Sequence, residues 1–548
     1  MNNTSNRAAD FWKTTTVYQI YPRSFFDSNG DGIGDLEGII QKLDYIQSIG
    51  FETIWISPFF CSPQADFGYD ISDYRNIAPE YGSLPIIERL INEIHKRKMY
   101  VVFDMVMNHT SNQHPWFKAS KSSNNNPKSD WYIWKKGKGK NPPNNWKSMT
   151  GGCGWHYVEE RDEWYFATFL PFQPDLNYHN EEVKKEMFDT IRYWLAKGVD
   201  GFRLDIFNVI MKDPAFRNNP WSYRLIPNEE NPDGFFQQNK YTVNYPQNFD
   251  FAKELRGVLN EYPNKFLVGE VFGNLKTIRE YIGDQDGLHA VFIFEMLKFK
   301  WNPEYFKTLI SKIENHFQSP AIPVYVFSNH DKKRSASRLN GNLEKSKLLH
   351  FLQFTLRGIP FMYYGEEIGM QNLNIPLKNG LDPIAKKYKT LPQFIVNRIS
   401  DTINRDEVRT PMQWNTTNNA GFTTHKNTWL PINPNYKTIN VETQLGDKNS
   451  LLNTIKDILS FRKDSLTLQR GTFKWFANSN LPKEILAFER IHENEELLIL
   501  LNFSEKSLKI DTLKSHSLIF GKKVTIQTNE NNNSFVFYSL GFGIFKIN

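Results

Sequence analysis

Gly201-Phe202-Arg203-Leu204-Asp205 decides the fold, because an apolar run carries an arginine and ends in a carboxylate. Side chains alternate between the two faces of a strand, so Arg203 and Asp205 should point the same way. A guanidinium beside a carboxylate keeps that carboxylate ionised. Val268-Gly269-Glu270 and Ser328-Asn329-His330-Asp331 repeat the pattern of an acid at a strand end. Three such acids predict one shared pocket, and a pocket of acids is typical of glycosidic chemistry.

Eight short β-type runs recur along the chain, and stretches with helical spacing separate them. The runs are Val17–Ile20, Thr53–Ile56, Tyr100–Phe103, Gly201–Leu204, Phe266–Gly269, Ala290–Phe294, Pro323–Phe327 and Ile359–Met362. Alternation of strand and helix indicates a parallel sheet, and eight such units predict an α/β protein with a closed (β/α)₈ TIM barrel. An open doubly wound sheet is the alternative, but no glycine-rich phosphate turn follows the first strand.

Two intervals are too long to be simple connections. Residues 105–174, rich in Asn, Lys, Trp and Gly, predict an inserted domain after the third strand. Residues from about 365 to 449 should shape the mouth of the active site. Residues 469–548 show alternating apolar runs divided by Asn and Gly turns, which predicts a C-terminal antiparallel β-domain, expected to be a β-sandwich. The barrel would comprise residues 1–104 and 175–468.

The composition is that of an ordinary globular protein, with 548 residues, 40% hydrophobic and 23% charged. The net charge of +6 is small for this length. The basic run at 135–140 is followed by Asn141-Pro142-Pro143, which favours a solvated loop over a nucleic-acid patch. The aromatic content of 15% is high, and although most rings should be core, sugar-binding clefts use aromatic faces.

Cysteine usage and the N-terminal sequence predict the compartment. Cys61 and Cys153 are the two cysteines of the chain, which is no disulfide framework and fits free thiols in a reducing environment. The N-terminus lacks the apolar segment of a secretory signal, and no run of about 18 apolar residues predicts a membrane span. We therefore expect a cytoplasmic enzyme without nucleic-acid or membrane partners. Its oligomeric state is left open.

Polar residues occupy the same topological position at several predicted strands. Catalytic residues of a (β/α)₈ barrel lie at the C-terminal ends of its strands. The residues at such ends here are Asp104, Arg203, Asp205, Glu270, His330 and Asp331. A helix cap or a surface acid would explain any one of them, but six at corresponding positions favour a single active site.

The chain resembles the α-amylase superfamily, glycoside hydrolase family 13, in motifs that follow the family's order. The matching motifs are Asp104–His109, Gln173–Asn177, Gly201–Asp205, Gly269–Val271 and Ser328–Asp331. The resemblance implies a barrel with an inserted domain after the third strand and a C-terminal β-domain. Within the family, the chain is similar to the oligo-1,6-glucosidase and α-glucosidase group through Tyr18–Phe25, Gly68–Tyr74, Arg409–Trp414 and the form of Gln173–Asn177.

The resemblance implies a role for each strand-end acid. Asp205 would be the nucleophile that forms a covalent glucosyl-enzyme, and Glu270 would protonate the leaving oxygen and then activate water. Asp331 would stabilise the oxocarbenium-like transition state, and the α-anomer should be retained. The implied substrate-binding residues are His109 and His330 on the glucose hydroxyls, Tyr69 stacked on the sugar ring, Asp70 and Arg409 closing the pocket around the non-reducing end, and Arg203 beside the nucleophile.

The run Asp27–Asp35 is a second chemical signal. Oxygen ligands at alternate positions together with turn glycines suit a hard cation. The run begins like an EF-hand loop, but its twelfth position is Gly38 rather than Glu, and an acidic turn without metal is the alternative. The resemblance implies a structural Ca²⁺ or Mg²⁺ site, whose ligands would be Asp27, Asn29, Asp31, Asp35 and the carbonyl of Ile33.

Asp70 and Arg409 favour an exo-acting pocket, which implies short α-glucosides as substrates. In the resembling group, Val after the nucleophile accompanies α-1,6 preference and Ala accompanies α-1,4, and Ile206 matches neither. Residues 297–301 read Leu-Lys-Phe-Lys-Trp, which departs from the Arg-Leu-Asp-Arg-Asp segment of sucrose isomerases and argues against isomerisation. A trehalose-6-phosphate hydrolase would need a phosphate pocket, for which the basic residues 332–334 are candidates.

Three functional hypotheses follow. The first is a retaining exo-α-glucosidase acting on maltose-, isomaltose- or sucrose-type di- and oligosaccharides. The second is a transglycosylating or sucrose-isomerising relative, in which a sugar replaces water. The third is a non-catalytic binding protein of the same fold, which would predict the loss of catalytic acids that this chain retains.

Overall fold

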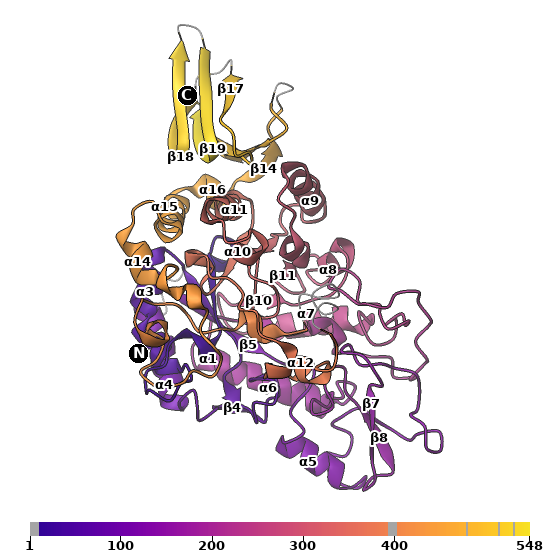
Figure 1. Cartoon of the computed structure of the whole chain (residues 1–548). Helices are drawn as coiled ribbons and strands as arrows, with labels where there is room; N and C mark the ends of the chain where they lie inside the picture. Colours follow the sequence, from indigo (N-terminus) through magenta and orange to yellow (C-terminus); the bar gives the residue numbers. More distant parts are fainter. Residues whose placement is uncertain (1–9, 393–402, 478–480, 513–515, 530–531, 548) are drawn as a thin grey trace.

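Eight parallel strands close into a barrel in the computed structural model, which describes residues 10–392, 403–477, 481–512, 516–529 and 532–547 (Figure 1). In barrel order the strands are β1 (Val17–Ile20), β2 (Thr53–Ile56), β5 (Tyr100–Met105), β9 (Gly201–Leu204), β10 (Phe266–Gly269), β11 (Ala290–Ile293), β12 (Val324–Val326) and β13 (Ile359–Tyr363). Pairing of Val17 with Phe361 joins β1 to β13 and closes the ring. The predicted barrel is confirmed. Residues 1–9, whose sequence predicts no signal peptide, lie outside the described residues.

Side-chain alternation along the strands separates two apolar layers. In β9, Phe202 and Leu204 face the large apolar cluster beneath the helices. The barrel interior is filled by a second cluster that includes Val17, Trp55, Val102, Phe266, Val268, Phe292, Val324 and Phe361. The barrel is therefore a packed core that supports a site at its rim.

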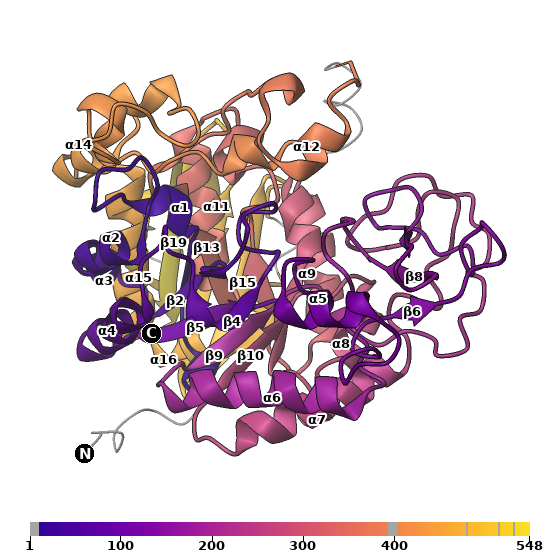
Figure 2. The ribbon, with the colours of Figure 1, turned by 90° about the horizontal axis from the view of Figure 1, so that it is seen from below.

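Helices cover the outside of the barrel (Figures 1 and 2). The principal ones are α4 (Leu84–Lys96), α6 (Glu181–Ala196), α7 (Gln247–Asn260), α8 (Leu275–Glu280), α9 (Pro303–His316), α11 (Leu343–Thr355) and α15 (Leu451–Asp464). Helix α4 buries Ile87, Leu90, Ile91 and Ile94 on one face, as its spacing predicts. Residues 36–49 form two helices, α2 (Leu36–Gln41) and α3 (Leu43–Ile49), because the helix is interrupted at Lys42.

A separate small unit lies between β5 and α6, in the interval of the predicted inserted domain. It contains α5 (Pro115–Ser122) and a three-stranded sheet of β6 (Trp134–Lys135), β8 (Glu163–Phe166) and β7 (Trp155–Val158). Ile133, Trp146, Trp155 and Phe166 give it a small core of its own. Figure 2 shows this unit to one side of the barrel. A buried ion pair of 2.8 Å between Asp175 and Lys212 joins the end of this segment to the loop after β9.

The C-terminal segment forms an antiparallel β-domain at one end of the molecule (Figure 1). Its strands are β14 (Thr472–Trp475), β15 (Ile485–His492), β16 (Glu495–Asn502), β17 (Leu508–Thr512), β18 (His516–Asn529) and β19 (Asn532–Ile547). In the described part these strands form one hydrogen-bonded antiparallel sheet, and the expected sandwich stays a prediction. The long strand β19 pairs with three neighbours at once, and its pairing with β18 shifts register at two points.

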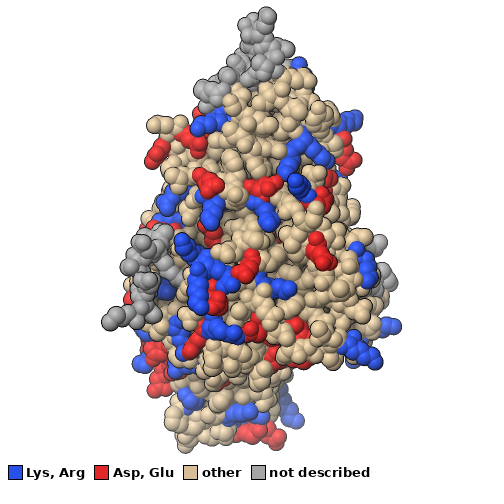
Figure 3. Space-filling view, turned by 90° about the vertical axis from the view of Figure 1, so that its left-hand side faces the viewer, with Lys and Arg blue, Asp and Glu red and all other residues tan. Residues whose placement is uncertain are grey.

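Charge and hydropathy of the described molecule agree with the composition. Figure 3 shows acidic and basic side chains interspersed over one face rather than gathered into a patch of one sign. Within the described ranges, no helix combines the length and the apolar character that crossing a bilayer requires.

Candidate active site

A cavity of about 220 Å³ opens where the carboxyl ends of the barrel strands meet. Asp205, Glu270 and Asp331, which follow β9, β10 and β12, all line it. The remaining lining residues are Asp66, Tyr69, His109, Met149, Thr150, Phe169, Gln173, Ile206, Pro227, Asn228, Glu229, Phe272, Phe294, Asn329, Lys332, Ile384 and Arg405. The three predicted catalytic acids therefore share one pocket.

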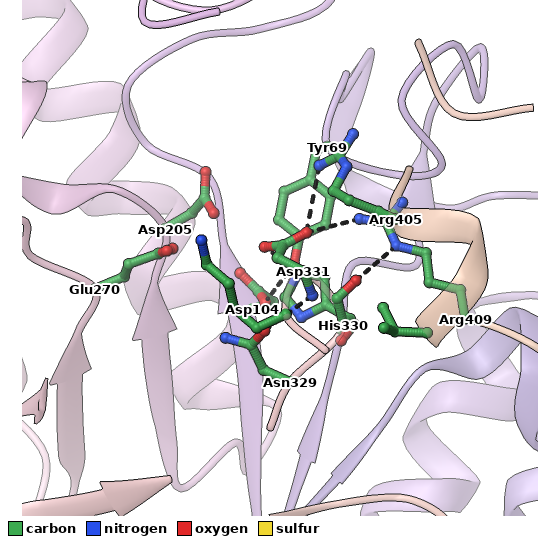
Figure 4. A network of polar contacts seen from close by, with 12 residues as sticks. Tyr69, Asp104, Asp205, Glu270, Asn329, His330, Asp331, Arg405 and Arg409 are labelled. Atoms are coloured by element: carbon green, nitrogen blue, oxygen red, sulfur yellow. Dashed lines mark hydrogen bonds and ion pairs between the residues drawn. The ribbon is translucent and has the colours of Figure 1, made fainter. Parts of the chain in front are cut away.

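Arg203 lies behind this cavity and contacts three carboxylates. Its Nη1 lies 2.8 Å from Asp104 Oδ1 and 2.8 Å from Asp205 Oδ1, and its Nη2 donates to Glu270 Oε2. The strand register explains the arrangement, since Arg203 pairs with Asp104 across β5 and β9 and lies beside β10. Figure 4 shows Asp205 and Glu270 projecting from neighbouring strands. The predicted proximity of Arg203 and Asp205 is confirmed.

Burial raises the pKa values of these carboxyl groups by different amounts. Burial raises the pKa of Asp205 to about 7 although Arg203 opposes the shift, and it raises the pKa of Glu270 to about 8 against the same guanidinium. The pKa of Asp104 rises to about 6 for the same reason. One buried cation does not hold three carboxylates fully ionised, so the three groups titrate as a coupled set. Two carboxyl groups whose environments separate their pKa values suit a nucleophile and a general acid.

Asp331 is held in its ionised form. Its Oδ1 lies 2.8 Å from Arg409 Nη2 and 3.4 Å from Arg405 Nη1 (Figure 4). Burial opposes ionisation, but His330, Arg405 and Arg409 outweigh it and hold the pKa of Asp331 well below its ordinary value. A fixed negative charge at this position can stabilise positive charge that develops on a bound sugar.

The two predicted histidines are neutral. Burial lowers the pKa of His330 to about 3 and that of His109 to about 4. The Gln19 amide donates to Nδ1 of His330 at 2.8 Å, which leaves the ring proton on Nε2, 2.6 Å from the Tyr69 hydroxyl. The Tyr69 and His330 rings also stack, with centroids 5.4 Å apart. Tyr69 and His109 line the cavity, and His330 supports Tyr69 from behind.

The structure corrects the placement of the predicted pair Asp70 and Arg409. The Asp70 carboxylate is fully buried and accepts from the backbone N–H groups of Ala65 and Asp66 at 3.0 and 2.9 Å, outside the cavity. Arg409 is also fully buried, and besides Asp331 it binds the His330 carbonyl oxygen at 2.9 Å. Gly68, at φ 104°, turns the loop. Asp70 therefore stabilises that turn, and Arg409 positions Asp331.

Asp66 and Arg405 occupy the cavity wall where the predicted pair was expected. Arg405 Nη2 lies 2.6 Å from Asp66 Oδ1, and both residues line the cavity. Asp66 and Arg405 are each four residues before the predicted residue, Asp70 and Arg409 respectively. Asp66 lies in the same loop as Asp70, and Arg405 lies one helical turn before Arg409.

Ile206, directly after Asp205, lines the cavity, whereas Phe207 is buried against Phe251. Ile206 has a left-handed backbone conformation with φ 37°. Its amide N–H lies 3.4 Å from Glu270 Oε2, so this conformation also points a backbone donor at the second acid.

Sequence reasoning missed several lining residues from long loops. Gln173 closes the inserted segment and donates to Asp66 at 3.0 Å. Glu229 comes from the loop between β9 and α7, which shows no periodic pattern. Of the basic residues 332–334, Lys332 lines the cavity. Arg334 is buried and donates hydrogen bonds to the carbonyl oxygens of Tyr364 and Val408.

The candidate metal loop presents hard oxygen donors. Asp27 accepts from the backbone N–H groups of Asn29, Gly30 and Gly32 at 2.7–3.1 Å. Asp31 accepts from the N–H of Ile33 at 2.8 Å, and Asp35 caps helix α2. In the part of the chain that the structure describes, no group of three or more His, Cys, Asp or Glu side chains is arranged to hold a metal ion. The oxygen donors of the loop fit the chemistry of Ca²⁺ or Mg²⁺, and the site stays a prediction.

Comparisons with known proteins agree with this geometry. Residues 19–471 match the sequence model described as "Alpha amylase, catalytic domain". An oligo-1,6-glucosidase of Parageobacillus thermoglucosidasius is 37% identical over 547 residues, which cover 94% of each chain. The crystal structure of an α-glucosyl transfer enzyme, XgtA, superposes with a TM-score of 0.88 at 34% identity and covers 99% of this chain and 100% of that one. An isomaltulose synthase from Erwinia rhapontici NX5, in complex with sucrose, gives a TM-score of 0.87 at 32% identity with the same coverage.

Proposed function

This chain belongs to the α-amylase family of glycoside hydrolases, and we propose that it is a retaining exo-α-glucosidase that removes the non-reducing terminal glucosyl unit of short α-glucosides. The observation that carries the proposal is one small cavity in which Asp205 and Glu270 share Arg203 and the Asp66–Arg405 ion pair forms part of the wall. A small cavity with this ion pair in its wall suits the terminal sugar of a short chain better than an internal unit of a polysaccharide.

In the first step, the Asp205 carboxylate attacks the anomeric carbon while the glycosidic C–O bond breaks. Glu270 donates its proton to the leaving oxygen, so the aglycone departs neutral. The assignment follows the resemblance of Gly201–Asp205 and Gly269–Val271 to the family's motifs, and the raised pKa of Glu270 lets this group hold a proton near neutral pH. Asp331, which is ionised, stabilises the positive charge on the sugar.

In the second step, the Glu270 carboxylate accepts a proton from water, and that water attacks the glucosyl-Asp205 ester. The ester bond breaks, Asp205 regains its negative charge, and Glu270 is again protonated. Two inversions at the anomeric carbon retain the α-configuration. Tyr69, His109, Asp66 and Arg405 line the cavity and supply the ring face and polar atoms for the bound glucose.

Hydrolysis of a panel of maltose, isomaltose, sucrose, trehalose and trehalose 6-phosphate tests the proposal. We expect glucose release from at least one neutral disaccharide, with α-glucose as the first anomer seen by ¹H NMR. A rearranged disaccharide from sucrose would identify the isomerising alternative, and preferential cleavage of trehalose 6-phosphate would identify the phosphate-specific one. Initial release of β-glucose would contradict the retaining mechanism.

Asp205→Asn tests the nucleophile. Loss of a covalent nucleophile should lower kcat by about 10⁴-fold or more, with an unchanged circular dichroism spectrum. Asp213→Asn is the matched control, because Asp213 follows the same strand but pairs with Arg217 outside the cavity. Near-normal turnover by Asp205→Asn would refute the assignment.

We also propose that the loop Asp27–Asp35 binds a structural Ca²⁺ or Mg²⁺ ion. The supporting feature is its set of hard oxygen donors. Metal analysis of the purified protein should find about one ion per chain, and chelation should lower the melting temperature. A metal-free protein whose melting temperature does not respond to added Ca²⁺ or Mg²⁺ would contradict the proposal.

A further inference from the structure

A buried ion pair of Glu229 and Lys332 lines the cavity next to the catalytic acids. Glu229 is 9% exposed, and its Oε1 contacts Nζ of Lys332, the residue that follows Asp331. A second lysine, Lys298, lies 2.9 Å from Glu229 Oε2. Burial opposes ionisation of Glu229, but Lys332 and Lys298 outweigh it and lower the pKa of Glu229 to about 2. Glu229 pairs with both lysines, and Glu230, 3.8 Å from Lys298, supplies the second negative charge that balances them.

A backbone contact ties Glu229 to the segment that follows the proton donor. The N–H of Gly273 donates to the Glu229 carbonyl oxygen at 2.7 Å, and Gly273 lies three residues after Glu270. A general acid in a glycosidase lies against the oxygen of the departing group. The Glu229–Lys332 pair is therefore on the leaving-group side of the cavity, whereas Asp66 and Arg405 belong to the glucosyl side.

We propose that Glu229 determines leaving-group specificity, so that the cavity accepts a neutral sugar and rejects a phosphorylated one. The inference rests on the proposed function, since it assigns the second half of the same cavity. Hydroxyl groups of a neutral sugar can donate to the Glu229 carboxylate and accept from Lys332. A phosphate would meet the Glu229 carboxylate at the wall, beside lysines whose two charges Glu229 and Glu230 already balance, which selects against the phosphate by repulsion.

Glu229→Gln tests this directly, because it removes the negative charge with little change of shape and takes away the carboxylate that pairs with Lys332. In the full-length enzyme, the inhibition constant of glucose 6-phosphate should fall about tenfold or more relative to that of glucose, with p-nitrophenyl α-glucoside as substrate. The kcat/KM for isomaltose or maltose should fall about tenfold relative to that for p-nitrophenyl α-glucoside, whose aryl leaving group has no hydroxyls. An unchanged ratio of the two inhibition constants would overturn the inference.

Two further variants separate specificity from general charge effects. Lys332→Met should lose preference for the disaccharide without gaining affinity for glucose 6-phosphate. Glu230→Gln is the matched control, because Glu230 lies 3.8 Å from Lys298 but does not line the cavity. An equal gain of phosphate affinity in Glu230→Gln would overturn the assignment to Glu229.

The wild-type enzyme can be tested directly, without any substitution. Trehalose 6-phosphate should be cleaved at least tenfold less efficiently than the best neutral disaccharide, and efficient cleavage would overturn the inference. Failure of the wild type to hydrolyse any α-glucoside would instead refute the proposed function. If the wild type hydrolyses p-nitrophenyl α-glucoside but Glu229→Gln leaves the ratio of the two inhibition constants unchanged, the proposed function stands. Only the specificity role of Glu229 is then refuted.

Discussion

Replacing Arg203 with methionine removes a buried cation that contacts Asp104, Asp205 and Glu270. An opposite charge in contact lowers a carboxyl pKa by roughly 1–3 units, so its loss should raise the pKa of Asp205 from about 7 to roughly 8–10. At pH 7 the ionised fraction of the nucleophile would then fall from about one half to between about one tenth and one thousandth. We therefore expect kcat/KM at pH 7 to fall by roughly 5- to 500-fold through protonation alone.

The pH dependence of kcat/KM distinguishes a change in the pKa of Asp205 from a loss of activity caused by movement of the catalytic side chains. A stopped assay with p-nitrophenyl α-glucoside between pH 5 and 10 should give a wild-type bell, because Asp205 must be ionised and Glu270 protonated. In Arg203→Met the acidic limb should move upward by about 1–3 pH units.

Arg462→Met is the matched control for the loss of a buried arginine. Arg462 is also buried, but it donates to the main-chain oxygens of Phe354, Leu468 and Gly358, away from the cavity. It should lower the melting temperature without moving either limb. If the pH profile of Arg203→Met has a lower maximum but its acidic limb lies at the same pH as that of the wild type, the electrostatic reasoning is refuted.

Other substitutions test the same structure. The folded-state pKa of Glu270 is raised to about 8, so the wild type loses stability as the pH rises between about 4.5 and 8. Glu270→Gln should therefore gain relative stability, of the order of a few kcal/mol, from pH 5 to pH 9 in urea unfolding, and a constant difference would contradict this. Asp66→Ala should raise KM, whereas Asp70→Ala should mainly lower the melting temperature, and the reverse pattern would contradict their placement. Lys212→Met removes the cation that pairs with the buried Asp175 and should cost about 3–5 kcal/mol of unfolding free energy, so an unchanged urea midpoint would contradict it.

The barrel and its acids could be predicted from the sequence because both depend on local pattern. Apolar runs of strand length recur between helical patterns, and an acid directly after such a run must lie at the strand end. Asp205, Glu270 and Asp331 satisfy that rule, and all three line one cavity.

The wall of the pocket depends on features that spacing does not determine. Asp66 and Asp70 lie in one loop, and a turn at Gly68 decides which carboxylate faces the cavity. Arg405 and Arg409 lie one helical turn apart, and both contact Asp331. Glu229 comes from a long irregular loop, whose path is set by contacts with distant segments rather than by periodicity.

Ile206 holds a conformation that its own side chain resists. Left-handed backbone angles suit glycine and are strained for a β-branched residue by the order of 1–3 kcal/mol. The same residue lines the cavity beside the nucleophile. Glycine would relieve this strain and widen the pocket, but it would also remove the side chain that is buried in the apolar cluster with Val209 and Val243. The side chain of Ile206 therefore narrows the pocket at the expense of a strained backbone, and glycine at this position should give a less selective enzyme.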